Sequence, residues 1–361
     1  MSDNRYQFYA AQESYFSAKV RPFFRYKSVP YVELAPTPAA YRDVIRARTG
    51  LAFIPVVITP DDETLQDTSD ILDELERRYP EPALYPPTPV QRLVAYLLEL
   101  YADEFLILPA LHYRWNFAES EAKARADFAR ASGDAATAAK FADRIKGALP
   151  FVGVNPDTIP AVEAHAREFL DILSAHFAQH DYLLGSRMSL ADLALLGPLY
   201  AHLSLDAVPS RILKETAPRV CAWIERMNHP EPKAGIFVAG DALPPTLRPL
   251  LELAGRDAAP MLIDNVRALE EWADSRPADM VEPPRGVGGH TTHLRGVELQ
   301  RMTSPYTLWM VQRPLDAYAA LAPAARAKVD AALAGTGLET ILAYKPRHRL
   351  GKQHFKLVFE A

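Results

Sequence analysis

The sequence predicts an α/β domain, then an all-helical domain, then a small α+β C-terminal extension. Three observations carry this prediction. Strand-type and helix-type patterns alternate over the first eighty or so residues, and a proline-rich segment follows them. Helical periodicity then begins at residue 90 and continues for about 180 residues. We therefore place the domains at residues 1–82, 90–275 and 278–361.

The first domain is predicted to have the order β-α-β-α-β-β-α. We expect strands at 6–10, 29–34, 54–58 and a short one ending at Leu65, and helices at 15–26, 41–48 and after a cap at Asp67 or Thr68. Pro22 lies inside the first helical pattern, which predicts either a helix start near Lys19 or a kink.

Five prolines between Pro80 and Pro89 exclude a helix or central strand and predict a stiff connector. Helices are then expected at 90–117, 119–131, 134–148, 158–179, 189–204, 210–228 and 245–274. Ser189 and Asp192 have the spacing of a capping box, with aspartate in place of glutamate.

The extension is predicted to be ordered. It has strand-like patterns at 291–302 and 339–359, two helices near 305–322 and 323–334, and a glycine-rich joint at 286–289. A segment this short can build only a thin hydrophobic core of its own. We therefore expect it to pack on the helical domain.

Composition excludes several classes of protein. The 40 basic and 45 acidic residues give a net charge of −5, which does not favour binding to nucleic acid. No apolar run reaches the roughly 18 residues of a membrane span, and the N-terminus lacks a signal-peptide pattern, so we expect a cytoplasmic protein. A single cysteine, Cys221, excludes a disulfide framework and a CxxC pair. The common glycine-rich nucleotide-binding motifs do not occur.

Four short segments, in their order and spacing, resemble the glutathione transferase superfamily over roughly residues 6–230. They are residues 14–21, 54–56, 67–71 and 189–192. The resemblance implies a thioredoxin-like first domain, glutathione as co-substrate, a homodimer, and a role in detoxification through attack on a small hydrophobic electrophile. The alternative is a non-catalytic binding or interaction protein with the same fold.

Ser14 follows the first strand and precedes the first helix, where the helix dipole favours an anion. The resemblance implies that its hydroxyl stabilises the glutathione thiolate. The alternative is a simple helix cap. Ser17 lies one turn later, and Tyr9 lies where the tyrosine-using branch of the family keeps its hydroxyl, so Tyr9 is the second candidate. Serine at position 14, where a reductase-like member would have cysteine, disfavours disulfide reduction.

The resemblance also assigns the glutathione contacts. Ile54 would pair with the peptide backbone of glutathione next to a cis Pro55, and Asp67 and Thr68 would bind its γ-glutamyl end. Arg48, or Arg46 beside it, is a candidate for the glycyl carboxylate, although basic residues on a surface helix are more often only solvated.

The same resemblance places the second-substrate pocket along the first long helix. An aromatic stripe on such a helix is more often part of a hydrophobic core. The candidates are Tyr101, His112, Tyr113 and Trp115, with Asp103 beside them. The histidines of the extension match no metal-site spacing, and we expect no metal. The extension itself would act as a lid over the pocket, as a dimer contact or as a structural buttress.

Overall fold

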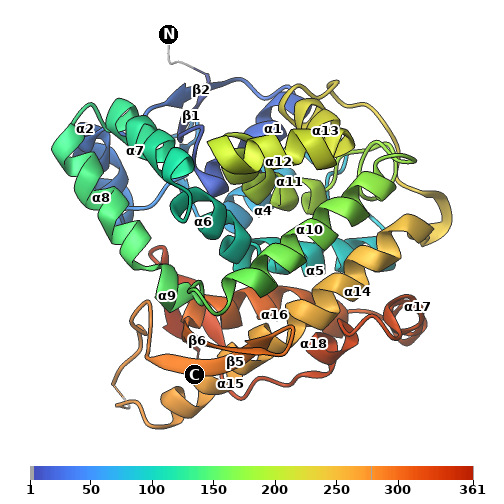
Figure 1. Cartoon of the computed structure of the whole chain (residues 1–361). Coiled ribbons are helices and arrows are strands. Elements are labelled where there is room, and N and C mark those ends of the chain that lie inside the picture. The colour runs from blue at the N-terminus through green and yellow to red at the C-terminus, as the bar shows by residue number, and fades with distance from the viewer. Residues whose placement is uncertain (1–3, 278, 361) are drawn as a thin grey trace. The chain divides into compact units, whose positions relative to one another are not determined.

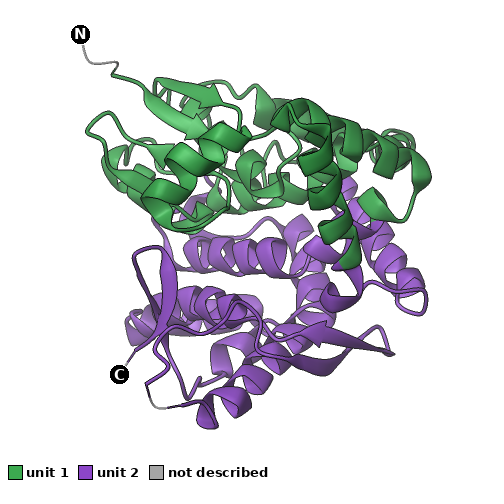
Figure 2. Cartoon of the chain, turned by 90° about the vertical axis from the view of Figure 1, so that its left-hand side faces the viewer, with its two compact units in different colours: residues 1–85, 113–147, 180–236 green, residues 86–112, 148–179, 237–361 purple. Residues whose placement is uncertain are grey.

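The computed structural model describes residues 4–277 and 279–360. The chain divides into two compact units (Figure 2). Unit 1 combines the chain up to Tyr85 with residues 113–147 and 180–236, and unit 2 combines residues 86–112, 148–179 and 237 onward. Both units take part of the region 90–275, so the three domain boundaries drawn from the sequence stay a prediction.

Unit 1 is built on a four-stranded sheet of order β2-β1-β3-β4. Its strands are β1 (Tyr6–Tyr9), β2 (Tyr31–Leu34), β3 (Val56–Ile58) and β4 (Thr64–Gln66). β1 runs parallel to β2 and antiparallel to β3, and β3 runs antiparallel to β4. Tyr9 lies opposite Val56, and Val56 lies opposite Gln66. The chain after β1, before β3 and after β4 therefore meets at one end of the sheet.

Helices lie on both faces of this sheet. They are α1 (Tyr15–Tyr26), α2 (Pro38–Ala40), the π-helical turn η1 (Tyr41–Ile45), α3 (Arg46–Thr49) and α4 (Thr68–Arg78). Phe8 packs on Phe24 of α1 with ring centroids 5.5 Å apart. Its neighbour Tyr9 points to the other face, where it joins a cluster with Ile45 and Val56.

The remaining helices of unit 1 are α7 (Ala118–Ser132), α8 (Ala135–Gly147), α11 (Leu190–Pro198), η2 (Leu199–Ser204), α12 (Ala207–Thr216) and α13 (Pro218–Asn228) (Figure 1). Of these, α11, η2 and α13 pack on α1, α12 packs on η2 and α13, and α7 packs on α12 and α8. Gly197 permits close packing of α11 on α1, because a Cβ atom there would lie 2.9 Å from the Tyr15 carbonyl oxygen. α6 (Ile107–Trp115) contributes residues to each unit.

Unit 2 joins helices of the predicted helical domain to the extension. The former are α5 (Pro89–Glu104), α9 (Leu149–Val152), α10 (Ile159–His176), α14 (Arg248–Asp257) and α15 (Ala259–Asp274), with the short turns η3 (Ala239–Asp241) and η4 (Pro245–Leu247). The extension has the hairpin β5 (Gly289–Leu294) and β6 (Val297–Met302), helices α16 (Pro305–Ala319), α17 (Pro323–Leu333) and α18 (Glu339–Ala343), and the hairpin β7 (Leu350–Gln353) and β8 (Lys356–Phe359).

The extension packs on helices, as the sequence predicts. β5 lies on α15, and α16 and α17 lie on α5. Leu294 of β5 is buried, and Leu299 of β6 is buried against Gly153 at the end of α9. Gly255 of α14 approaches Gly337 so closely that a Cβ atom on Gly255 would lie 2.0 Å from the Thr336 carbonyl oxygen. The extension is therefore an integral part of unit 2.

Prolines explain where predicted helices are divided. The segment 90–117 forms two helices, because Pro109 has no N–H for the Phe105 carbonyl, which instead accepts from Leu108 at 3.0 Å. Pro218 and Pro260 divide 210–228 and 245–274 in the same way. By contrast, α1 begins at Tyr15 and continues through Pro22, so the predicted start near Lys19 is wrong.

The sequence predicts a strand-like segment at 339–359. This prediction is wrong for residues 339–343, which form the helix α18. The architecture is a thioredoxin-like sheet with its helices, an all-helical region, and an extension of two small sheets and helices. None of the described helices is both long enough and apolar enough to cross a membrane.

Candidate functional site

Three of the predicted glutathione-binding segments meet at one end of the unit 1 sheet. Ser14 follows β1, Pro55 precedes β3, and Asp67 follows β4. The pairing of Tyr9 with Val56 and of Val56 with Gln66 places all three at the same end. The Ile54–Pro55 peptide is cis, as predicted, and Ile54 remains partly exposed.

Ser14 caps the N-terminus of α1. Its backbone is extended, and its Oγ atom accepts a hydrogen bond from the Ser17 N–H at 3.3 Å. A hydroxyl that accepts this bond still has its own proton to donate, so capping and anion binding are compatible. Ser17 is buried, and its Oγ accepts the Ala11 N–H at 3.4 Å, so Ser17 serves the loop.

Two buried arginines hold the loop that carries Ser14. Arg21 donates from Nη2 to the Ala11 carbonyl at 3.1 Å, and Arg114 donates from Nη1 to the Glu13 carbonyl at 3.1 Å. Arg114 also donates to Asp206 Oδ2 at 2.7 Å. These bonds fix the loop before any ligand binds. The role of Arg114 was not found from the sequence, where its only signal is a charge among apolar residues of a helix.

Tyr9, the second candidate for the thiolate, has a different environment. It is 8% exposed within the apolar cluster on the α3 side of the sheet, and its hydroxyl donates to Gln7 Oε1 at 3.3 Å. Ser14, in contrast, presents its hydroxyl at a helix N-terminus. The geometry therefore favours Ser14 of the two.

The start of α4 combines a helix N-terminus with a buried lysine. Asp67 adopts φ +79° and accepts the Ser69 N–H at 3.0 Å, and Thr68 beside it is buried. Lys19 of α1 is wholly buried and donates from Nζ to Ser69 Oγ at 3.4 Å. A helix dipole and a nearby cation both favour an anion here. Lys19 was missed because its approach to α4 depends on tertiary packing.

Arg48 of α3 reaches the turn between β3 and β4 with its side chain. Its guanidinium donates to Asp62 Oδ1 at 2.6 Å and to Thr64 Oγ1 at 3.2 Å. This ion pair gives Arg48 a structural role, and its assignment to the glycyl carboxylate stays a prediction. Arg46 is exposed on α3.

The four residues predicted for the second-substrate pocket are all buried: Tyr101, His112, Tyr113 and Trp115. In unit 1, Tyr113 stacks on Phe117 with centroids 5.7 Å apart, and Trp115 packs on Phe128 at 6.0 Å. In unit 2, His112 Nε2 lies 3.0 Å from Glu163 Oε1. Burial agrees with the core alternative, and a pocket role for these residues stays a prediction.

Tyr101 belongs to a buried polar chain in unit 2. Its hydroxyl lies 2.7 Å from His165 Nε2, and His165 Nδ1 lies 2.7 Å from Asp257 Oδ2. Burial lowers the pKa of His165, so a neutral imidazole donates from Nδ1 to the carboxylate and accepts from Tyr101. Arg295, at the turn of the β5–β6 hairpin, donates to the same carboxylate at 2.8 Å. These buried polar contacts thus connect the extension to α10 and α14.

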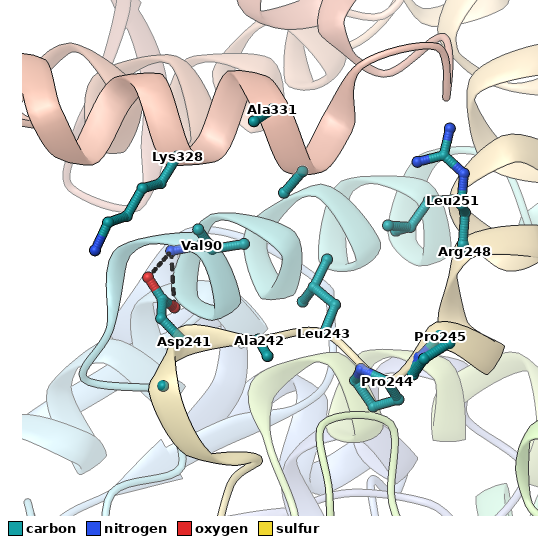
Figure 3. A pocket seen from close by; sticks show the side chains of 12 residues that line it. Val90, Asp241, Ala242, Leu243, Pro244, Pro245, Arg248, Leu251, Lys328 and Ala331 are labelled. Atoms are coloured by element: carbon teal, nitrogen blue, oxygen red, sulfur yellow. Dashed lines mark hydrogen bonds between the residues drawn. The ribbon is translucent and has the colours of Figure 1, made fainter.

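The two cavities found in unit 2 contain none of the predicted site residues. One, of about 460 Å³, lies between α5, α14 and α17, with Arg248 and Lys328 on its wall (Figure 3). At its edge the Asp241 carboxylate accepts the Val90 N–H at 3.1 Å and caps α5. The other, of about 570 Å³, lies beside α15 and β5 and includes His290. Among the described residues, no group of three His, Cys, Asp or Glu side chains could hold a metal ion.

Several solved structures resemble this chain. A glutathione S-transferase from Methylobacterium radiotolerans, in complex with glutathione sulfonate, is 21% identical over 65% of this chain and 98% of its own, with a TM-score of 0.40. A beta-etherase from Sphingobium sp. strain SYK-6 is 16% identical over 64% and 97%, with a TM-score of 0.46. A Tau class glutathione S-transferase from mango, Mangifera indica, is 18% identical over 68% and 95%, with a TM-score of 0.40.

No match was found among curated protein sequences. Two family models do match, within roughly the residues 6–230 over which the sequence resembles the superfamily. Residues 8–83 match the glutathione S-transferase N-terminal domain, and residues 149–231 match the glutathione S-transferase C-terminal domain. The first match contains Ser14, Pro55 and Asp67, and the second contains the capping box at Ser189. In these two regions the chain resembles the glutathione transferase superfamily.

Proposed function

We propose that this protein is a glutathione transferase in which Ser14 stabilises the glutathione thiolate for attack on a small hydrophobic electrophile. The observation that carries the proposal is the meeting of Ser14, Pro55 and Asp67 at one end of the sheet, where α1 and α4 both begin. The match of residues 8–83 to the glutathione S-transferase N-terminal domain supports glutathione as the co-substrate.

The chemistry follows from the placement of these groups. An ordinary thiol has a pKa of about 8.5, so little thiolate is present at neutral pH. The Ser14 O–H and the N-terminal end of the α1 dipole stabilise the charged form and so lower the thiol pKa. The γ-glutamyl end would bind at the start of α4 near Lys19, and the backbone of Ile54 would pair with the cysteinyl unit as an added strand.

Ser14→Ala tests the proposal, with Ser17→Ala as the matched control. A donor to a developing anion is typically worth about 2.7–4 kcal/mol, so Ser14→Ala should lower kcat/KM about 10²–10³-fold and raise the pKa of bound glutathione by about two units. That pKa is read from the ultraviolet absorbance of the thiolate. Ser17→Ala should change neither quantity by more than about threefold. Parent activity and parent thiolate pKa in Ser14→Ala would refute the assignment.

Binding can be tested apart from catalysis. Thr68→Val keeps the shape of the side chain and should weaken glutathione binding about tenfold, as expected when a hydrogen bond to a charged group is lost. A chain that is retained on immobilised glutathione, but converts no electrophile, would be the non-catalytic binding protein. The expected homodimer is checked by light scattering of the purified protein.

A further inference from the structure

The cavity of about 460 Å³ in unit 2 has no part in the proposed function. Its walls come from the start of α5, the segment 240–251 and the middle of α17. All twelve residues that line it lie outside the ranges 8–83 and 149–231, so the cavity is not a feature of the matched glutathione S-transferase domains. Its volume is within the range of about 300–1,000 Å³ that is usual for small-molecule sites.

Most of the cavity wall is apolar. Eight of the twelve lining side chains are apolar, and they come from all three parts of the wall. Val90 of α5 and Leu251 of α14 form a buried floor, whereas Ala331 of α17 is exposed at the opposite wall (Figure 3). A ligand with an alkyl chain would be removed from water along these walls, which is favourable.

Among the described residues that line the cavity, only Asp241 is acidic, and its charge is offset. Asp241 Oδ1 accepts the N–H groups of Val90 and Gln91 at 3.1 Å each, and Oδ2 accepts the Val90 N–H at 3.1 Å (Figure 3). The positive end of the α5 dipole therefore compensates the carboxylate. The two other charged residues on the wall, Arg248 and Lys328, are both basic.

Lys328 of α17 is a free cation on this wall. Within residues 4–277 and 279–360, its ammonium group has no hydrogen-bond or ion-pair partner. An exposed lysine is by itself ordinary, because such side chains are usually only solvated. Lys328 differs in lying at the rim of an apolar cavity that has a second cation.

Arg248 of α14 is the second cation. Its Nε lies 2.8 Å from Glu252 Oε1, and its Nη2 donates to the Ala334 carbonyl at 2.9 Å. A guanidinium has five N–H donors, so three of them have no partner among the described residues. Glu252 offsets part of the charge of Arg248 but leaves these donors available to a carboxylate.

The two cations are separated along α17. The Arg248 guanidinium contacts Ala334, directly after α17, and Lys328 precedes Ala334 by six residues. At a rise of 1.5 Å per residue, six residues span about 9 Å along the helix axis. Figure 3 shows Lys328 and Arg248 on opposite sides of the cavity, with Leu243 and Leu251 between them. The cavity thus has a positive charge at each end and an apolar middle.

We propose that this cavity binds a linear dicarboxylate with an apolar chain, with one carboxylate at Lys328 and the other at Arg248. The chain between the carboxylates would lie against the apolar walls. A compact anion, such as inorganic phosphate, would reach only one of the two cations. The inference does not depend on the proposed function, because the cavity shares no residue with the site of Ser14, Pro55 and Asp67.

Isothermal titration calorimetry of the full chain tests the inference with decanedioate and its monomethyl ester, which has the same carbon chain and one charge fewer. The parent should bind the diacid about fivefold more tightly than the ester, as expected for one more exposed ion pair. Lys328→Gln and Arg248→Gln should each weaken binding of the diacid about fivefold and remove its advantage over the ester. Lys345→Gln, at an exposed lysine of the extension outside the cavity, is the matched control and should change neither affinity.

A second pair of variants tests the apolar part of the cavity. Ala331→Leu places a larger side chain on the cavity wall and should weaken both ligands about tenfold, as when about two methylene groups of the ligand lose their burial. Ala327→Leu, at an exposed position of α17 that does not line the cavity, should leave both affinities unchanged. Thermal denaturation confirms that each variant is folded.

Three results would overturn the inference. The first is a parent that does not bind decanedioate within the solubility limit of the acid. The second is binding that Lys328→Gln, Arg248→Gln and Ala331→Leu all leave unchanged, because the acid would then occupy another site. The third is equal affinity of the parent for the diacid and the ester, because a single cation would then account for binding.

Discussion

Asp192 offers a sharp test of how unit 1 is held together, because its carboxylate is fully buried at the start of α11. Oδ1 accepts the Leu183 N–H at 2.9 Å and the Trp223 Nε1–H at 3.2 Å. Oδ2 accepts the Ser189 N–H at 2.9 Å and the Ser189 hydroxyl at 2.6 Å. Asp192→Ala removes the acceptor of all four bonds.

The size of the destabilisation by Asp192→Ala follows from the hydrogen-bond donors that lose their acceptor. The Ser189 hydroxyl can rotate to another acceptor, but the two N–H groups of Leu183 and Ser189 and the indole of Trp223 cannot. Each unpaired buried donor costs about 1–3 kcal/mol, so Asp192→Ala should lower the free energy of unfolding by about 3–5 kcal/mol. Asp192→Asn keeps one carbonyl oxygen and should cost less at neutral pH.

The charge of Asp192 makes this cost depend on pH. Burial raises the pKa of Asp192 to about 6, above the ordinary value of 3.8. A carboxyl group whose pKa is raised in the folded protein contributes stability while it is protonated. This contribution is fully present below the pKa of the group in the unfolded chain and is lost as pH rises through its pKa in the folded protein. Asp192→Asn cannot ionise at this position. Between pH 4 and pH 7 the free energy of unfolding of the parent should therefore fall by about 3 kcal/mol relative to that of Asp192→Asn.

Urea denaturation followed by circular dichroism at several pH values between 4 and 8 measures both effects. A difference between the parent and Asp192→Asn that stays constant over this range would show that the carboxyl does not resist ionisation. Asp192→Ala within about 1 kcal/mol of the parent would show that the four bonds do not hold unit 1 together.

Three further predictions concern other charged or titratable groups. Arg114→Met leaves the buried Asp206 with only the more distant Lys123, whose Nζ lies 3.9 Å from Asp206 Oδ1, and should destabilise the protein by about 3–5 kcal/mol in urea denaturation, whereas a loss below about 1 kcal/mol would contradict this role. Burial lowers the pKa of His290 to about 4, so stability present above its unfolded pKa of about 6.5 is lost as pH falls toward 4. Between pH 7 and pH 4.5 the free energy of unfolding of His290→Gln should therefore fall by about 1–2 kcal/mol less than that of the parent. Melting temperatures at the two pH values measure this difference. Asp241 adopts φ +63° while it caps α5, so Asp241→Ala should cost more than Asp241→Gly by about 1 kcal/mol in the same urea assay; equal losses would show that the backbone at this position is not strained.

Local signals in the sequence were sufficient for much of the fold. Ser189 and Asp192 form the predicted capping box, and Asp67 and Ser14 cap the helices that follow them. A cap needs only its own residue and the next three, so three or four letters of sequence determine it. Helix length was less predictable, because the helical pattern that contains Pro109 is divided into α5 and α6, whereas α1 continues through Pro22.

The supporting groups of the site could not be predicted, because they come from distant parts of the chain. Arg114 reaches the Glu13 carbonyl from about a hundred residues away in the sequence, and Lys19 reaches Ser69 from fifty. No pattern in α6 marks Arg114 as different from a buried aromatic residue beside it.

The three-segment composition of unit 2 has a consequence for synthesis of the protein. Unit 1 has all of its segments once residue 236 has been made, whereas unit 2 then still lacks everything from residue 237 onward. Until that point α5 has neither its cap at Asp241 nor the cover of α16 and α17. We expect the apolar faces of α5 and α10 to stay exposed on the ribosome during this interval, so that unit 2 completes its fold late and is the part of the nascent chain that chaperones protect.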